Sequence, residues 1–200
     1  MKKVLVLDFG GQYNLLVARR VRECGVYCEI KSFRMSMEEI RAFAPDALIF
    51  TGGPATVFEP NAPMVDKALF EMGIPVLGIC YGEQLMMHLL GGQCRKAETR
   101  EYGKVELTHK ESPLFADVPE TAVYWMSHGV EVERMAPGFE IIGSTEGCLH
   151  AAVQCVDKKL YGVQFHPEVL HTEYGTQILK NFLYTICGFG PEWTMASYME

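Results

Sequence analysis

The chain of 200 residues has no excess of basic residues, no long apolar run and no even set of cysteines. Lys and Arg number 18 against 25 Asp and Glu, and this net charge of −7 argues against a nucleic-acid partner. No apolar stretch approaches the roughly 20 residues that span a bilayer, and the N-terminus lacks the organisation of a signal peptide. We therefore expect neither nucleic-acid binding nor a membrane segment.

The seven cysteines are spread through a chain that is too large for a disulfide scaffold. Their odd number favours a reducing, cytoplasmic compartment. Cys24 and Cys28 have a loose ligand-like spacing, but no matching second pair follows, so we expect no metal site. The glycine pairs lack the Lys and Ser/Thr of a phosphate-binding P-loop. With 48% hydrophobic residues, the chain predicts one globular domain with a sizeable core.

Short apolar runs alternate with segments of helical periodicity in the first ninety residues. This alternation predicts an α/β fold of three layers, with a mainly parallel, twisted sheet and helices on both faces. The expected strands are Val4–Asp8, Val26–Ile30, Ala47–Phe50 and Pro75–Cys80; the expected helices are Leu15–Arg22, one opened by the Ser36–Glu39 capping box, Pro63–Met72 and Leu85–Leu90. Sites in such sheets lie at the carboxyl ends of the strands.

The second half predicts an antiparallel extension of the same sheet, closed by an amphipathic helix. The expected elements are strands Lys104–Thr108, Ala122–Met126, Glu140–Ser144, Ala151–Val156 and Leu160–Phe165, and helix Thr176–Ile186. We divide the chain into a domain over 1–189 and a tail over 190–200, whose apolar residues have no obvious core to join. The tail is either a frayed end or a connection to a partner.

Cys80 stands where a strand is expected to turn into a helix, between Gly78 and Gly82. Glycines two residues before and after a nucleophile are typical of a strand–turn–helix elbow. The N-terminal N–H groups of the following helix favour a thiolate. A buried cysteine is more often structural, so the assignment needs a partner base.

The partner base is expected in the His166-Pro167-Glu168 stretch, directly after the strand that ends at Phe165. His166 then lies at a strand end, and Glu168 is close enough to bond its second imidazole nitrogen. Nucleophile, base and orienting carboxylate together make a Cys-His-Glu triad. A His-Pro-Glu stretch taken alone is more often a capped turn.

A cysteine attack on a carbonyl also needs donors for the developing oxyanion. The backbone N–H groups of Gly53, which follows the third strand, and Tyr81, which follows Cys80, are the candidates. Gln84 lies one helical turn beyond Cys80 and is expected to face the same cleft, although a solvent-facing side chain is equally compatible with the sequence. His128, in the Ser127–Val130 stretch, is expected to be structural.

Three motifs carry a resemblance to the class I (triad) glutamine amidotransferases. They occur in family order as Thr-Gly-Gly-Pro from Thr51, Gly-Ile-Cys-Tyr-Gly-Glu-Gln from Gly78, and Gln-Phe-His-Pro-Glu from Gln164. The resemblance implies a flavodoxin-like class I amidotransferase fold and hydrolysis of glutamine through a γ-glutamyl thioester on Cys80, with ammonia passed to an acceptor site. It implies roles for residues at matching positions: His166 as acid and base, Glu168 as its orienter, Gly53 and Tyr81 as oxyanion donors, and Gly52, Gln84, Ser127, Gly129 and Val130 as the glutamine site.

Further stretches are similar to the amidotransferase part of GMP synthetases. They are Val6–Tyr13, Ala18–Glu23, Trp125–Gly129 and Trp193–Ser197. In that subfamily the tail leads to an ATP-pyrophosphatase domain or subunit that uses ATP and Mg²⁺ to adenylate XMP, which is then aminated to GMP. This chain has no Ser-Gly-Gly-x-Asp-Ser loop. The expected partner is therefore a synthetase domain or subunit, with no cofactor in this chain.

Two residues depart from the subfamily pattern: Gly11, where serine is usual, and Val130, where aspartate is usual after Ser-His-Gly. The effect of Val130 on glutamine affinity is left open by the sequence. It depends on whether the family uses the side chain at this position or only the backbone. Another triad amidotransferase or cysteine hydrolase, of the anthranilate or carbamoyl phosphate type, is the alternative enzyme. A non-catalytic regulatory module of the same fold is the alternative of a different class.

Overall fold

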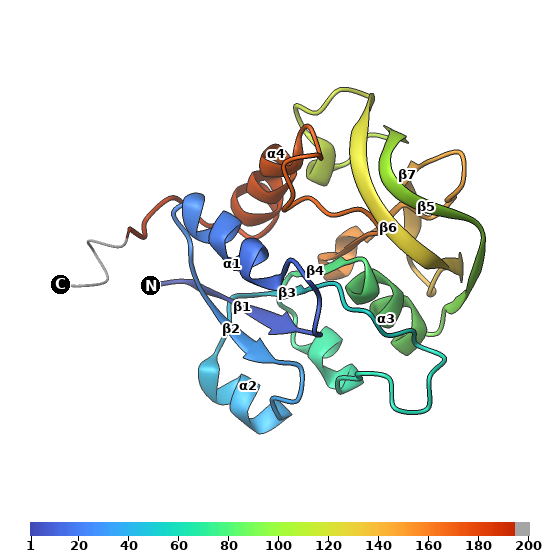
Figure 1. Ribbon diagram of the computed structural model, residues 1–200. Coiled ribbons are helices and arrows are strands. Elements are labelled where there is room, and N and C mark those ends of the chain that lie inside the picture. Colours follow the sequence, from blue (N-terminus) through green and yellow to red (C-terminus); the bar gives the residue numbers. More distant parts are fainter. Residues whose placement is uncertain (195–200) are drawn as a thin grey trace.

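The computed structural model describes residues 1–194, and within them a nine-stranded sheet has the order β2-β1-β3-β4-β9-β8-β7-β5-β6. The sheet is parallel across β2, β1, β3, β4 and β9. It continues with antiparallel pairings through β8, β7, β5 and β6 (Figure 1). The parallel strands are β1 (Lys3–Asp8), β2 (Tyr27–Ser32), β3 (Ala47–Phe50), β4 (Val76–Ile79) and β9 (Leu160–Val163). The antiparallel strands are β5 (Gln93–His109), β6 (Thr121–Arg134), β7 (Glu140–Ser144) and β8 (Ala152–Cys155).

Helices cover both faces of the parallel strands, so the predicted three layers are confirmed. The α-helices are α1 (Asn14–Glu23), α2 (Met37–Phe43), α3 (Tyr81–Leu89) and α4 (Gly175–Lys180). The 3₁₀ turns are η1 (Lys67–Glu71), η2 (Pro113–Phe115) and η3 (Val156–Lys158), and α4 continues as a π-helix, η4 (Asn181–Ile186).

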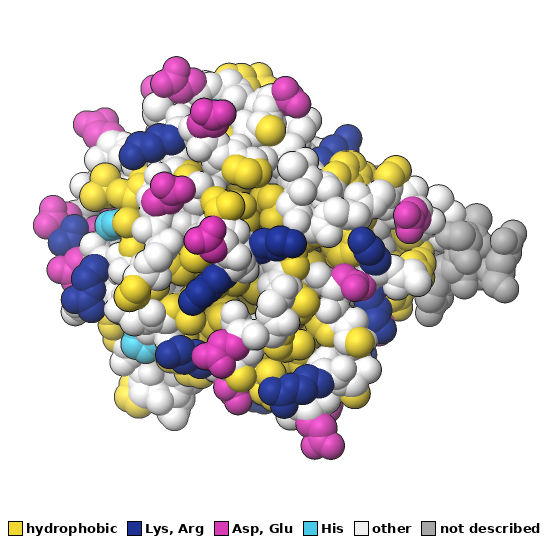
Figure 2. Space-filling view, turned by 180° about the vertical axis from the view of Figure 1, so that it is seen from behind, with side chains coloured by type: hydrophobic (Ala, Val, Ile, Leu, Met, Phe, Trp, Pro, Cys, Tyr) yellow, Lys and Arg dark blue, Asp and Glu magenta, His cyan; other side chains and the backbone are white. Residues whose placement is uncertain are grey.

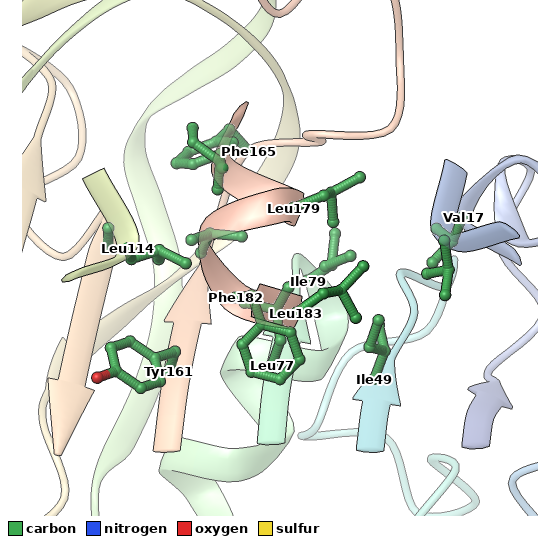
Figure 3. Packing of buried hydrophobic residues seen from close by; sticks show 14 of the residues in the cluster. Val17, Ile49, Leu77, Ile79, Leu114, Tyr161, Phe165, Leu179, Phe182 and Leu183 are labelled. Carbon is green, nitrogen blue, oxygen red and sulfur yellow. The ribbon is translucent and has the colours of Figure 1, made fainter. Parts of the chain in front are cut away.

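Alternation along each strand builds two cores. Val4 and Val6 of β1 face α1, α4 and η4, whereas Leu5 and Leu7 face α2, η1 and α3. Figure 3 shows the first core, to which Phe182 of η4 and Leu77 of β4 both belong. All the residues of β3, β4 and β9 are buried. Burial on both faces of the sheet explains why these strands are nearly continuous apolar runs.

The surface carries no large area of one charge on the face seen in Figure 2, where acidic and basic side chains are interspersed. The seven cysteines are all free thiols. No helix within residues 1–194 combines the length and the apolar content that a membrane crossing requires.

Four expectations about elements need correction. The helix over Pro63–Met72 is only the 3₁₀ turn η1, because Asp66 is extended, with ψ 130°, and its carboxylate caps Ala68. The two strands expected at 104–108 and 122–126 are parts of the much longer β5 and β6. Strand β9 ends at Val163, two residues before the expected end. The closing helix changes to π geometry at Asn181, whose side chain bonds carbonyls of the η2 turn.

The start of the tail does have a core to join, contrary to expectation. Trp193 is buried, and Phe189, the last residue of the domain, is buried just before it. The backbone N–H of Trp193 donates to the carbonyl of Gly25 at 2.7 Å, and its ring lies beside that of Tyr27. The tail therefore packs beside the start of β2 at Trp193, and residues 195–200 lie outside the described part.

Candidate active site

Cys80 follows β4 directly and is the N-cap residue of α3. Its backbone has φ 55° and ψ −109°, a left-handed conformation that residues other than glycine rarely adopt. Such a conformation costs about 1–3 kcal/mol and persists where the surroundings enforce it. The N–H of Cys80 donates to the carbonyl of Val163 at 2.7 Å, which anchors the turn to β9. The predicted strand–turn–helix elbow is confirmed.

The two glycines beside Cys80 are required by close backbone packing. A Cβ atom on Gly78 would lie 2.6 Å from the carbonyl oxygen of Gly82. A Cβ atom on Gly82 would lie 2.6 Å from the carbonyl oxygen of Phe50 in β3. Because backbone atoms cannot yield as side chains do, the spacing of glycines around Cys80 follows from the turn itself.

His166 and Glu168 meet as the sequence predicts, with Nδ1 of His166 2.6 Å from Oε1 of Glu168. A carboxylate accepts, so Nδ1 carries the hydrogen and Nε2 is left for the Cys80 sulfur. Both side chains are buried. Cys80, His166 and Glu168 are thus brought together at the carboxyl ends of β4 and β9.

The charge state of His166 depends on these two neighbours. Burial acts to lower the pKa of His166, but the hydrogen bonds and negative charges of Cys80 and Glu168 together outweigh it and raise the pKa from 6.5 to about 10. An imidazolium beside a cysteine sulfur favours the thiolate, which is the nucleophilic form.

Two further side chains hold the backbone of this segment. The hydroxyl of Thr172 donates to the carbonyl of His166 at 2.7 Å and accepts from the N–H of Trp125 at 3.0 Å. The guanidinium of Arg20, on α1, donates to the carbonyl of Glu168 at 3.0 Å. The His-Pro-Glu stretch is therefore fixed to both β6 and α1.

Two cavities have Cys80 in their walls. One of about 410 Å³ also contains Gly53, Tyr81, Gln84, Ser127, His128, Gly129 and Val130 in its wall. The other, of about 360 Å³, is lined by Gly10–Asn14, Gly52–Pro54, Cys80, Ser127, His166 and Glu168. The candidate oxyanion and glutamine residues thus line the first cavity, except Gly52, which lines the second with the His-Glu pair.

The two candidate oxyanion donors lie beside the nucleophile. Tyr81 is the first residue of α3, where backbone N–H groups have no partner within the helix. Gly53 passes so close to Phe9 that a Cβ atom would overlap the carbonyl oxygen of Phe9. Both residues line the larger cavity with Cys80, and their backbone N–H groups remain the candidate donors for an oxyanion.

Gln84 is buried, which excludes the solvent-facing alternative. Its Nε2 donates to the carbonyl of Val130 at 3.0 Å and to Oε1 of Gln164 at 3.1 Å. The Val130 residue thus contributes its backbone carbonyl to this network. Its side chain is 8% exposed and packs with the apolar core under α3.

Gly11, the second departure, has no room for a side chain. A Cβ atom there would overlap the carbonyl oxygen of Gly52 and lie 2.8 Å from Oδ1 of Asn14. A serine at this position would require the backbone near the smaller cavity to shift. Gly11 is therefore required by the close packing of its loop against Gly52.

His128 is structural, as expected, and belongs to a buried polar cluster. Its Nδ1 donates to the carbonyl of Val130 at 3.1 Å, and its Nε2 lies 2.9 Å from Oε1 of Glu101. Thr145 donates to the other Glu101 oxygen at 2.8 Å. Cys148 completes a group whose ligand-type atoms lie within 4.8 Å of one another, but His128 and Glu101 already satisfy each other.

Sequence reasoning missed several residues of the site. Lys96 and Arg100, on β5, add positive charge to the wall of the larger cavity. Nothing local marks them, because β5 reaches this cavity only through its pairing with β6. Gln164 lies in the Gln-Phe-His-Pro-Glu motif, but the sequence does not reveal that its side chain contacts Gln84 and Cys80.

The comparisons with known proteins agree with this geometry. The family model described as "Glutamine amidotransferase class-I" matches residues 5–186. A glutamine-hydrolysing GMP synthase of Caldicellulosiruptor saccharolyticus is 56% identical over 198 residues, which cover 98% of this chain and 39% of that protein.

Solved structures show the same fold. A structure from Thermoplasma acidophilum, described as that of a GMP synthase subunit, is 30% identical with a TM-score of 0.86, covering 100% of this chain and 96% of that one. A glutamine amidotransferase from Thermotoga maritima is 17% identical with a TM-score of 0.73, covering 94% of this chain and 99% of that one. The chain belongs to the class-I glutamine amidotransferase family.

Proposed function

We propose that the chain hydrolyses the side-chain amide of glutamine to glutamate and ammonia. The observation that carries the proposal is the meeting of Cys80, at a strained elbow, with a His166 whose Nδ1 is bonded to Glu168. The two cavities that Cys80 lines would give substrate and water access to it. The family membership of the chain supports the same chemistry.

In the first half-reaction the Cys80 thiolate attacks the carboxamide carbon of glutamine. The N–H groups of Gly53 and Tyr81 stabilise the oxyanion of the tetrahedral intermediate. Protonated His166 gives its proton to the leaving nitrogen, so that ammonia departs and a γ-glutamyl thioester remains on Cys80.

In the second half-reaction His166, now neutral, takes a proton from water, and the hydroxide attacks the thioester carbon. The carbon–sulfur bond breaks, glutamate leaves, and the Cys80 thiolate and the protonated His166 are restored. Glu168 keeps the imidazole in one orientation through both halves.

The larger cavity is the proposed glutamine site. Gln84, Ser127, Gly129 and Val130 supply polar backbone or side-chain groups there, and Gly52 borders the sulfur from the other cavity. Lys96 and Arg100 are suited to the α-carboxylate of glutamine, since they bring the positive charge into this wall.

We further propose that the ammonia aminates XMP to GMP on an ATP-dependent partner. The chain spans 39% of the length of the GMP synthase that it matches. An ATP-pyrophosphatase domain or subunit would hold ATP and Mg²⁺, and residues 190–200 would lead toward it from a domain over 1–189. Trp193, packed along the start of β2, would fix the point from which that connection leaves. Seven free thiols suit a cytoplasmic enzyme.

The test is labelling with the glutamine analogue 6-diazo-5-oxo-L-norleucine, followed by peptide mass spectrometry. One adduct on Cys80, blocked by excess glutamine, is the expected result. Glutamate release is expected to be slow for the chain alone and faster with a GMP synthetase partner, ATP and XMP, because closing a site on the acceptor avoids waste of ammonia. Absence of both the adduct and glutamate release in that mixture would refute the proposal.

A further inference from the structure

Gln164 presents its side-chain amide to the candidate nucleophile. It follows β9 directly, and the pairing of Ile79 with Val163 places Gln164 beside Cys80. The side chain is completely buried, with 0% exposed. Its Nε2 lies 3.5 Å from the Cys80 sulfur, within the range of a hydrogen bond to sulfur. The triad mechanism leaves this contact unused.

The orientation of the Gln164 amide follows from its neighbours. The carbonyl of Val130 can only accept, so Gln84 must turn its NH₂ group toward it. The same NH₂ group lies 3.1 Å from the Gln164 side chain, which must therefore offer its oxygen there. Gln164 is then left with its NH₂ group facing Cys80. We call Gln164, Gln84 and the Val130 carbonyl the amide relay.

The far end of the relay is held in place. His128 also donates to the Val130 carbonyl, and its other nitrogen lies 2.9 Å from buried Glu101. A carbonyl that receives two donors from buried side chains has little freedom to turn. The relay thus connects a fixed polar cluster at the β5–β6 hairpin with the sulfur.

We propose that Gln164 holds Cys80 as its thiolate by donating an amide N–H to the ionised sulfur, in an orientation that the relay imposes. A neutral thiol is a weak acceptor and a thiolate is a strong one, so the donor favours the charged form. His166 gives up its proton during turnover, whereas an amide does not titrate. Gln164 therefore presents the same donor to the thiolate before the thioester forms and after it is hydrolysed. The inference requires only that Cys80 react as a thiolate, so its test needs no glutamine.

The test is the pH profile of Cys80 alkylation by iodoacetamide, followed on the Cys80 peptide by mass spectrometry in the 200-residue chain. Gln164→Met keeps the volume and removes the donor. Alkylation at pH values below the wild-type midpoint is expected to slow about tenfold, as for loss of one hydrogen bond to a charged group. The midpoint of the profile is expected to move to higher pH by about one unit. The limiting rate at high pH is not expected to fall, because a thiolate that has lost a donor is at least as nucleophilic.

Gln154→Met is the matched control. Gln154 is another buried glutamine, on β8, and its amide bonds Ser112 and Glu140 instead of Cys80. Its loss is expected to leave the alkylation midpoint in place. If Gln164 were merely structural, its variant would lower the limiting rate or impair folding and leave the midpoint unmoved, which would overturn the inference.

A second measurement on the unmodified protein covers the case in which Gln164→Met fails to fold. The side-chain amide of Gln164, followed by ¹⁵N-resolved NMR, is expected to shift with pH at the same midpoint as Cys80 alkylation. A resonance that does not respond across that range would overturn the inference. Either result stands whether or not the chain hydrolyses glutamine, so failure of the proposed function is recognised separately.

Discussion

Nδ1 of His166 lies 2.6 Å from Oε1 of Glu168, only two residues further along the chain. Pro167 between them lacks an N–H, and Thr172 and Arg20 bond the flanking carbonyls, so the pair is held by its backbone as well as by its own contact. Within residues 1–194, Oε2 of Glu168 is buried without a hydrogen-bond partner. The His166 contact is thus the one that the Glu168 carboxylate makes.

Glu168→Gln is expected to lower kcat for glutamine hydrolysis by about 10²–10⁴-fold, with a much smaller effect on KM. An amide carries no charge to stabilise the imidazolium, and its NH₂ group can select the wrong tautomer. Steady-state glutamate release measures this, with Glu173→Gln as the control, since Glu173 lies in the same segment and bonds the N–H of Val123. A variant that turns over like the wild type would remove Glu168 from the triad.

Arg100→Met is expected to raise KM for glutamine about fivefold and to leave kcat unchanged, because an exposed ion pair contributes about 1 kcal/mol. Lys96→Met is expected to act in the same direction, since both side chains line the larger cavity. Lys104→Met is the matched control on β5, since Lys104 lies outside that cavity wall. Equal KM values for all three variants would show that the α-carboxylate binds elsewhere.

Gly82→Ala is expected to destabilise the fold by at least about 2 kcal/mol, because the added carbon meets the backbone of β3. Urea denaturation measures the change. Gly190→Ala is the control: a Cβ atom there meets only the Glu192 side chain, at 3.7 Å or more, and its effect is expected to stay within about 0.5 kcal/mol. Equal stabilities would contradict the close packing of the elbow.

The parts of the site that depend on local geometry are the parts that the sequence predicts. Gly78 and Gly82 mark the elbow at Cys80 because the turn excludes side chains at those two positions. Glu168 is expected to meet His166 because it follows only two positions later in the chain. Both predictions need only a few neighbouring residues.

The remaining parts depend on contacts between segments that are distant in the sequence. Gln164 reaches Cys80 through the β4–β9 register, and Gln84 reaches Val130 only once α3 is packed on the sheet. The prediction of a helix over 63–72 is wrong, because the Asp66 side chain caps a shorter 3₁₀ turn there. Amphipathic spacing does not distinguish such a turn from a longer helix. Trp193 packs against Tyr27, which lies near the opposite end of the chain.

Glu83, on α3, is a buried acidic residue whose side chain is expected to destabilise the folded protein. It is completely buried between α3 and β9, where the Cβ position of Gly162 lies 2.8 Å from its Cγ. Within the described residues both of its carboxylate oxygens are buried without a hydrogen-bond partner. Burial, and to a lesser extent the charge of Cys80, raise the pKa of Glu83 well above 4.5.

The raised pKa of Glu83 determines whether the stability of the protein rises or falls with pH. Above 4.5 the unfolded chain loses the Glu83 proton while the folded chain keeps it, so the folded state binds more protons and stability falls as pH rises. The fall continues until the folded carboxyl itself ionises. The neighbouring thiols do not reverse the sign, because burial raises the pKa of Cys94 to about 12, and that of Cys148 is raised further.

Glu83→Met is therefore expected to stabilise the protein by about 1–3 kcal/mol at neutral pH, the penalty of an unsatisfied buried polar group. The gain should be smallest near about pH 5 and should grow toward about pH 8, as measured by urea denaturation across that range. Glu83→Gln separates the cost of burying a polar group from the effect of titration. It keeps a buried polar group but does not titrate, so its stability relative to Glu83→Met should not vary with pH. A gain for Glu83→Met that is constant with pH would show that Glu83 is ionised in the folded protein.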